Sequence, residues 1–311
     1  MAYEHTLREP VSCSGVGLHS GAPVNLRILP ASAGTGVVFR RTDLDGFEIE
    51  ATGSNVAKVS YATSLMKKGV LISTTEHLLS AFIGLGVDNA IVELDNLELP
   101  ILDGSAQPFV DMALRSGLKH QRRKRAYLKI LKEVEVRDGD KFIAVYPANG
   151  YSVSYLIDFK HPLIGKERFE VELMARHTDG TRGMDGDFYR RDIAAARTFG
   201  FLHEAPAMRK MGLIRGASEE NAIVLTQTGV ANGPLRYKDE FVRHKVLDLI
   251  GDLALIGKRI FGRVVADRAG HAMHTALVSR LLRDHSLWEE TTDDSFGDED
   301  EVFAGVAAAR A

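Results

Sequence analysis

The stretch FVRHKVLDLIGDL, residues 241–253, decides the fold of this region and the chemistry to look for. Its Val, Leu and Ile residues recur at helical spacing, and successive helical residues lie about 100° apart around the axis. His244, Asp248 and Asp252 stand at i, i+4 and i+8, so they form one ridge, with Lys245 beside it. The sequence therefore predicts a helix with an apolar back and a narrow polar front.

This polar ridge has two explanations, and both stay open from this helix alone. A polar helix face usually contacts water, although such faces are broad and rich in Lys and Glu. A His and an Asp one helical turn apart can instead bind a single metal ion. The metal hypothesis requires another ligand from a distant part of the chain.

The stretch STTEHLLSAF, residues 73–82, offers a second histidine. Ser73 followed by Glu76 matches a capping box, in which the Glu side chain bonds back to the helix start. His77 would then be a half-buried histidine on a short helix. An adjacent Glu-His pair also occurs in zinc hydrolases, where the His binds the metal and the Glu takes a proton from water. Both interpretations of the pair remain open.

A third histidine fragment is RAGHAMHTAL, residues 268–277. Gly270 permits a close approach of the backbone, and His271 follows it at a predicted helix start. A nearby carboxylate such as Asp252 would shift the pKa of His271. His274, three residues on, is a second metal-ligand candidate, but we expect it at the surface.

Length and composition fit a globular protein with two domains. The chain has 311 residues, of which 45% are hydrophobic and 26% charged. It contains no apolar run of 18 residues, so we expect no membrane span. The first residues, MAYEHTLREPVSCSGVG, lack an apolar signal core, and Cys13 is the only cysteine. These features predict a cytoplasmic location.

Charge is distributed unevenly along the chain. The formal net charge is −3, but residues 289–301 hold eight acids and no Lys or Arg, which leaves 39 basic and 34 acidic residues elsewhere, a charge of +5. A mildly basic body suits an anionic small molecule and is too weak a signal for nucleic acid. We expect the acidic tail to be a disordered, solvating segment.

Strand and helix patterns occur in both halves of the chain. The basic run KHQRRKR, residues 119–125, marks a boundary, either as a solvated linker or as a patch that faces phosphate or lipid. Predicted strands cover 22–31, 35–42, 89–96 and 151–159, and an Asp-Gly at 138–139 predicts a hairpin within 126–148. Predicted helices cover 73–86, 108–117, 192–199, 240–257 and 271–285. This mixture indicates an α+β fold, and no dinucleotide fingerprint or Walker loop is present.

Several of these stretches together resemble the UDP-3-O-acyl-N-acetylglucosamine deacetylase family, zinc enzymes of lipid A biosynthesis in Gram-negative bacteria. The resemblance extends from about residue 5 to about residue 290. The stretches that carry it are SGVGLHSG (14–21), FRRTD (39–43), STTEHLLSA (73–81), GVDNA (86–90), PILDGSA (100–106), ARTFGF (196–201), EFVRHKVLDLIGDL (240–253) and GHAMH (270–274).

The resemblance implies two similar α+β domains, each a β-sheet packed on helices, with the helices sandwiched between the two sheets. Residues 1–121 would form the first domain, with a small insert near 45–65. Residues 126–290 would form the second, with a strand–helix–strand insert near 198–225. Residues 291–311 would be the tail, and HTDGTRGMDGD (177–187) is longer than the family pattern needs and is expected to be a flexible loop insertion.

The resemblance also implies a catalytic Zn²⁺, one per chain, with Fe²⁺ as an alternative in the cell. The implied ligands are His77, His244 and Asp248, which leave a position open for water. The substrate would be UDP-3-O-acyl-N-acetylglucosamine, and hydrolysis of its acetamide would release acetate. We expect no nucleic-acid partner and no membrane span, and we expect the chain to act as a monomer.

Catalytic roles follow from the same resemblance. Glu76 would be the general base, and His271 the protonated acid, oriented and kept charged by Asp252. Lys245 would serve a phosphate or the oxyanion, with an ordinary solvated lysine as the alternative. Thr198 would donate a hydrogen bond to the oxyanion.

Substrate contacts are implied for a further set of residues. Phe159 would stack on uracil, or be one side chain of a strand, while Phe199 would contact substrate or only pack. His19 would lie near the mouth of the acyl passage, and Gly270 would contact the substrate. The nucleotide is assigned to Lys141, Asp158, Phe159 and Lys245, and the acyl passage to Leu18, Phe201, Ile214, Ala217 and Ser218.

One departure concerns His274, because the family pattern often ends in Asn at this position. An extra histidine near the site predicts a second, inhibitory zinc. If His274→Asn left inhibition by excess zinc unchanged, this hypothesis would fail.

Two rival functions are also consistent with the residues. Two histidines and a carboxylate describe the facial triad of Fe(II) oxygenases, which dependence on O₂ would reveal. A non-catalytic sugar-nucleotide binding protein would explain a basic body but not Glu76, His271 and Asp252, and turnover by a metal-loaded sample would exclude it.

Overall fold

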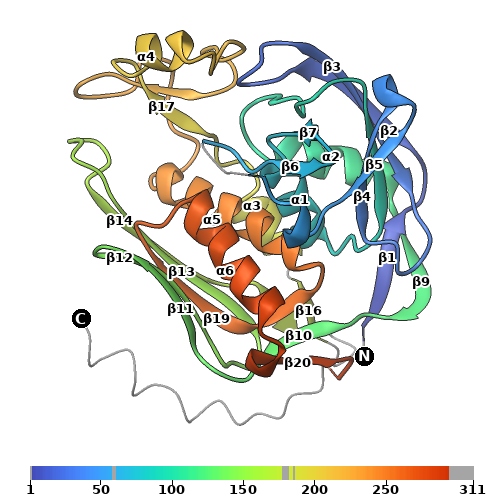
Figure 1. Ribbon diagram of the computed structural model, residues 1–311. Coiled ribbons are helices and arrows are strands. Elements are labelled where there is room, and N and C mark those ends of the chain that lie inside the picture. Colours follow the sequence, from blue (N-terminus) through green and yellow to red (C-terminus); the bar gives the residue numbers. More distant parts are fainter. Residues whose placement is uncertain (1, 58–60, 177–181, 185, 294–311) are drawn as a thin grey trace.

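The structure is a computed structural model that describes residues 2–57, 61–176, 182–184 and 186–293. Two large sheets lie on opposite sides of a layer of helices, and the longest helices, α5 (Glu240–Leu253) and α6 (His271–Arg283), run through the middle (Figure 1). The predicted α+β class is confirmed.

The first sheet has five strands in the order β2-β3-β8-β4-β5. Their neighbours run antiparallel except for β4 and β8, which are parallel. Alternate residues of β3 are buried, as expected for a sheet with one face toward a core. The strands and their two helices are β2 (Val11–Val16), β3 (Pro23–Pro30), β4 (Val37–Arg41), β5 (Phe47–Glu50), β8 (Ala90–Leu94), α1 (Glu76–Leu85) and α2 (Gln107–Ser116).

The second sheet has seven strands around the central β19. Strand β19 pairs antiparallel with β12 and parallel with β10 and β13. The predicted hairpin is confirmed, because β11 and β12 pair with Asp138 opposite Lys141 and Gly139 has a φ of 62°. The strands are β10 (Tyr127–Ile130), β11 (Val134–Asp138), β12 (Lys141–Tyr146), β13 (Tyr151–Asp158), β14 (Lys166–Glu172), β19 (Arg259–Asp267) and β20 (Trp288–Thr291).

Smaller elements complete the fold. One small unit, called the α4 unit below, projects beside the helices (Figure 1). It consists of strand β17 (Phe199–Phe201), helix α4 (Ala205–Lys210) and strand β18 (Ile223–Leu225), and β17 and β18 pair in parallel. The others are β6 (Leu65–Lys67), β7 (Val70–Ile72), β15 (Met174–Arg176), β16 (Arg182–Met184), α3 (Gly186–Asp192), and the 3₁₀ turns Thr42–Leu44, Gly53–Asn55, Ala254–Ile256 and His285–Leu287.

The basic run at 119–125 is not a linker. Residues Leu118–Lys124 form strand β9, which pairs antiparallel with β1 (Tyr3–Leu7), while Arg125 is 5% exposed and bonds to Asp88. Several cations on β9 are exposed, and a charged edge strand discourages pairing with other chains. The basic composition of this run correctly indicated exposed side chains, but exposed side chains can also belong to a strand.

The helix predicted over 192–199 is also wrong. Helix α3 ends at Asp192, and the chain then turns until β17 begins at Phe199. Ile193, Ala194 and Ala196 are buried, so their apolar character reflects tertiary packing rather than a helical face. This turn brings the Ala196 carbonyl to the helix that carries His244, where it accepts a hydrogen bond.

Helix α5 is buried on nearly all sides, since it packs against α1, α6 and the second sheet. At Gly251 a Cβ would lie 2.0 Å from the carbonyl oxygen of Glu76. Only glycine allows so close a crossing. The crossing sets the start of α1, with Glu76 and His77, directly against the polar ridge of α5.

Three sequence predictions are not tested by the described residues. The 177–187 loop lies partly, and the acidic tail almost wholly, outside the described residues. The domain bounds at 121 and 126 stay a prediction. Within the described part of the chain, no helix combines the length and apolarity needed to cross a bilayer.

Candidate metal centre and active site

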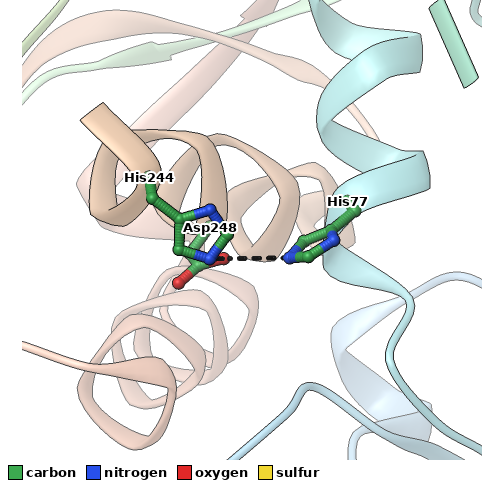
Figure 2. A group of neighbouring side chains, drawn as sticks. All are labelled: His77, His244 and Asp248. Carbon is green, nitrogen blue, oxygen red and sulfur yellow. Dashed lines mark ion pairs between the residues drawn. The ribbon is translucent and has the colours of Figure 1, made fainter. Parts of the chain in front are cut away.

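Three of the predicted metal ligands lie together between α1 and α5. Figure 2 shows His77 on α1 facing His244 and Asp248 on α5. The Oδ1 atom of Asp248 is 3.6 Å from Nε2 of His77 and 3.4 Å from Nε2 of His244. All three residues are at most 4% exposed. The structure therefore brings the ligand trio together from two segments far apart in sequence.

The trio fits a divalent metal ion chemically. Oδ1 of Asp248 is buried and has no hydrogen-bond partner among the described residues, although a buried carboxylate oxygen normally has one. Nδ1 of His244 lies 3.0 Å from the Ala196 carbonyl, to which it donates, so Nε2 keeps its lone pair. Burial lowers the pKa of His244 to about 4, which keeps the ring neutral as a ligand must be.

Lys245 is not an ordinary solvated lysine. Its Nζ lies 2.7 Å from Oδ2 of Asp248, the carboxylate oxygen other than the one nearest His77 and His244. Burial opposes the charge on Lys245, but Asp248 outweighs it and raises the pKa of the ammonium group. Burial likewise opposes charge on Asp248, yet His244 and Lys245 hold the pKa of that carboxyl well below its usual range. An ionised carboxylate is the form that binds metal.

Glu76 faces the same centre. Its carboxylate is 3% exposed, and burial raises its pKa to about 7, near the operating range of a general base. The capping box was a wrong prediction, because α1 begins at Glu76 and Ser73 Oγ bonds instead to Ser64 Oγ at 2.8 Å. The Glu76 side chain accepts from the Thr63 backbone N–H at 3.1 Å and is otherwise directed to the site.

His271 approaches from the start of α6. Its Nε2 is 3.9 Å from Oε1 of Glu76 and 3.7 Å from Oδ2 of Asp248, while its Nδ1 is 2.7 Å from Oδ2 of Asp252. Burial opposes the charge of His271, but Asp252 outweighs burial and raises the pKa to about 9. Burial would raise the pKa of Asp252, yet His271 lowers it to about 2. Asp252 thus contacts His271 and favours its charged form, while the catalytic roles of the two residues stay predictions.

Two residues that support this pair were missed by sequence reasoning. Thr63 donates its hydroxyl to Oδ1 of Asp252 at 2.5 Å, across 189 residues of sequence, and also bonds to Glu76. Tyr155 on β13 contacts His274 and the Ala269 carbonyl. No local pattern marks a Thr or Tyr for such a role, so only the fold reveals them.

His274 is not a surface residue. It is 0% exposed, and its Nδ1 lies 2.8 Å from Oδ2 of Asp252. The residue faces inward because it stands one turn along α6, between Asp252 and Tyr155. Asp252, His271 and His274 form a second group with metal-ligand geometry, so the inhibitory-zinc hypothesis stays a prediction.

Thr198 follows the turn that supports His244. Its N–H donates to the Gly104 carbonyl at 2.8 Å, and its carbonyl accepts from the N–H of Ile223 at 2.8 Å. The neighbouring Arg197 pairs with Glu240, which is 0% exposed, at 2.9 Å. These bonds fix the segment beside the centre, while the oxyanion role of Thr198 stays a prediction.

The predicted substrate residues fall into two groups on this structure. Phe159 lies 5.7 Å from Phe199 and 5.9 Å from Phe201 between ring centroids, and Phe199 reaches 6.3 Å from His244. This aromatic cluster (Phe159, Phe199, Phe201) extends from the second sheet to the metal centre. Lys141 and Asp158 are exposed, at the start of β12 and the end of β13.

The second group joins the first half of the chain to the α4 unit. The N–H of Arg215 donates to the His19 carbonyl at 3.1 Å, and the N–H of Gly216 donates to the Leu18 carbonyl at 3.0 Å. Both ring nitrogens of His19 are buried without a hydrogen-bond partner among the described residues. Ile214 and Ala217 flank this junction and are half-buried, whereas Ser218 is exposed.

Gly270 has an extended backbone, and a Cβ there would meet no atom within 4 Å. The chain itself therefore does not require glycine at this position. Approach of a substrate to this backbone stays a prediction.

Comparisons with known proteins all indicate the same family. The family model described as "LpxC: UDP-3-O-acyl N-acetylglycosamine deacetylase" matches residues 4–283. A relative from Solibacter usitatus, named UDP-3-O-acyl-N-acetylglucosamine deacetylase, is 51% identical, with 94% of this chain and 96% of the relative covered. Relatives of the same name from Cellvibrio japonicus and Saccharophagus degradans are each 41% identical, with 97% and 94% of this chain and 96% and 94% of the relatives covered.

Proposed function

The chain belongs to the UDP-3-O-acyl-N-acetylglucosamine deacetylase family, and we propose that the centre between α1, α5 and α6 is its active site. The protein is a hydrolase that removes the N-acetyl group of UDP-3-O-acyl-N-acetylglucosamine and releases acetate, a step of lipid A biosynthesis. The Fe(II) oxygenase and the non-catalytic binding protein are set aside, because members of this family are named as deacetylases.

One observation carries the assignment of the site. Glu76 and His271 both face the metal-ligand trio, and Nε2 of His271 lies within 4 Å of Glu76 and of Asp248. A base, an acid and a metal position thus surround one small volume, as amide hydrolysis requires. We assign the metal to His77, His244 and Asp248, with Zn²⁺ as its identity.

A divalent ion held by the trio would supply a Lewis acid that polarises the acetyl carbonyl and lowers the pKa of water. Glu76 then accepts a proton from the attacking water, because its carboxylate faces the centre and burial raises its pKa to about 7. Nε2 of His271, protonated and aimed inward, donates to the oxyanion or the leaving amine. Lys245 and Thr198 would stabilise the developing negative charge.

The activity is tested by acetate release. Purified protein loaded with one equivalent of Zn²⁺ is incubated with UDP-3-O-acyl-N-acetylglucosamine, and acetate and the free amine are quantified together. Equal amounts of both products are expected. UDP-N-acetylglucosamine without the acyl chain serves as the substrate control, and a protein that releases acetate from neither compound would contradict the assignment.

Replacing Asp252 with Asn should move the alkaline limb of the pH–rate profile. His271 works in its protonated form, so its pKa sets the alkaline limb, and kcat/KM is lost as the pH rises through it. The acid limb belongs to Glu76, which must be deprotonated. Without the Asp252 charge, burial dominates and the pKa of His271 falls. The alkaline limb should therefore shift to lower pH. Asp111→Asn, which removes an exposed carboxylate from α2, is the control, and an unmoved limb in the Asp252 variant would contradict the role of this pair.

The nucleotide and acyl assignments are also part of the proposal. Phe159 offers its ring for stacking on uracil, Lys141 and Lys245 offer charge to the diphosphate, and Asp158 lies beside Phe159. The acyl chain would run along Leu18, Phe201, Ile214 and Ala217, below the α4 unit, with His19 and Ser218 at its ends. The backbone junction between residues 18–19 and 215–216 supports this passage, because it joins both walls.

Phe159→Ala should weaken substrate binding more than turnover. Stacking of a base on an aromatic ring contributes about 1–3 kcal/mol, so KM should rise about 5- to 150-fold with little change in kcat. Phe169→Ala, which removes another partly buried ring from the second sheet, is the matched control. Steady-state kinetics measure both values, and an unchanged KM for Phe159→Ala would remove the ring from the nucleotide site.

A further inference from the structure

A buried histidine lies behind the proposed catalytic pair and is not used in the mechanism above. His274 is 0% exposed and stands one turn beyond His271 on α6. Its Nδ1 lies 2.8 Å from Oδ2 of Asp252, the same oxygen that accepts from His271 at 2.7 Å. Burying an imidazole costs free energy unless its nitrogens form hydrogen bonds. The contacts of the two His274 nitrogens therefore indicate what this residue does.

The partner of Nδ1 determines which nitrogen of His274 carries the proton. Asp252 is ionised and can only accept, so Nδ1 of His274 must donate to it. Burial lowers the pKa of His274, which leaves the ring neutral with this single proton. Nε2 lies 3.1 Å from the Tyr155 hydroxyl oxygen, and that hydroxyl donates its proton to the Ala269 carbonyl at 2.7 Å.

Three donors from two parts of the chain, the Thr63 loop and α6, thus hold the Asp252 carboxylate. Thr63 donates to Oδ1, while His271 and His274 both donate to Oδ2. Tyr155, on the second sheet, anchors His274 from behind. Without His274, Oδ2 would lose a donor in a site where Asp252 is 0% exposed, and the carboxylate could rotate away from His271.

We propose that His274 is a positioning residue for deacetylation, whose buried imidazole holds the Asp252 carboxylate in the orientation that aims His271 into the metal centre. The inference rests on the proposed function of His271 and deepens it. Outer-shell partners of this kind typically change activity about 10- to 100-fold when removed. His274 acts through Asp252 and His271 and does not contact the substrate.

Two substitutions separate the hydrogen bond from packing. His274→Leu keeps a similar volume but removes the donor, and kcat should fall about 10- to 100-fold while KM changes less than about threefold. His274→Asn restores an N–H close to the place of Nδ1, so most of the lost kcat should return. Tyr155→Phe removes the hydroxyl beside the same imidazole but leaves the bond to Asp252, so its kcat should fall less than that of His274→Leu. His5→Leu is the matched control, because it removes a half-buried imidazole that contacts Arg125 and lies outside this site.

A double-mutant cycle tests whether His274 acts through His271. In a His271→Ala background, His274→Leu should lower kcat no further, because the residue that it positions is gone. Metal content and thermal unfolding are measured for every variant, so a folding or loading defect is recognised separately. Should His274→Leu fail to fold, His274→Ala takes its place and is judged by the same outcomes. Its kcat should fall about 10- to 100-fold in the wild-type background and no further in the His271→Ala background.

Three outcomes would overturn the proposal. These are wild-type kcat in folded His274→Leu, equal losses in the Leu and Asn variants, and an undiminished effect of His274→Leu in the His271→Ala background. The wild-type protein is assayed alongside. If it releases acetate about 10²- to 10⁴-fold faster than His271→Ala, the proposed function stands whatever the fate of His274.

Discussion

Glu76→Gln is expected to retain the metal and to lower kcat about 10²- to 10⁴-fold, the usual contribution of a general base. The amide has the shape of the carboxylate and can still accept the bond from the Thr63 N–H, so the start of α1 should be unchanged. It cannot take a proton from water, so the chemical step should fail. Steady-state acetate release and metal analysis of the same sample measure both properties.

Stability gives this prediction an internal control. Burial raises the pKa of Glu76 to about 7, so above that pH the folded state carries a buried charge that the unfolded chain would hold in water. Gln removes this cost, and the metal-free variant should unfold at the same temperature as wild type or higher at pH 8. A variant with full metal, normal stability and wild-type kcat would exclude Glu76 as the base.

His244→Ala is expected to lose both the metal and the activity. The substitution removes one of three ligands and leaves two, His77 and Asp248, in the buried trio. Loss of an outer partner alone lowers metal affinity about 10- to 100-fold, so loss of a ligand should lower it further. Metal retention after dialysis against a weak chelator and acetate release are measured on the same preparation.

His161→Ala is the matched control for this variant. His161 is also a buried imidazole, 7% exposed, with Nε2 2.9 Å from the Thr226 carbonyl, and it is not part of the metal-ligand trio. It should keep the metal. If His244→Ala kept its metal and turned over substrate as fast as wild type, His244 would be only a buried polar residue.

Local sequence patterns predicted the parts of the site that lie on one helix. The i, i+4 and i+8 spacing on 241–253 set His244, Asp248 and Asp252 on one ridge, and the fold keeps them there. The Asp-Gly pair likewise predicted the β11–β12 hairpin. Both predictions depend on geometry that a short segment determines by itself.

Other features depend on contacts between distant segments, and the sequence alone did not predict them. The Ser73–Glu76 spacing matches a capping box, yet the close crossing at Gly251 and the bond from Thr63 direct Glu76 elsewhere. The apolar run before Phe199 was interpreted as a helix, although it packs as a turn that delivers a carbonyl to His244.

His274 illustrates the same limit at a single residue. Its spacing from His271 does not distinguish an exposed from a buried side of α6, because that choice depends on where the second sheet and α5 lie. Tyr155 on β13 and Asp252 on α5 settle it. The resemblance to the deacetylase family supplied the activity, whereas the position of His274 came only from the fold.

A metal titration of the stripped wild-type protein tests the central claim most directly. The protein is freed of metal with a chelator, Zn²⁺ is added in steps, and the rate of acetate release is measured at each step. The rate should start near zero, rise linearly and break at one equivalent per chain. Full acetate release by the stripped protein, or no recovery at any Zn²⁺ concentration, would contradict a metal-dependent deacetylase centred on His77, His244 and Asp248.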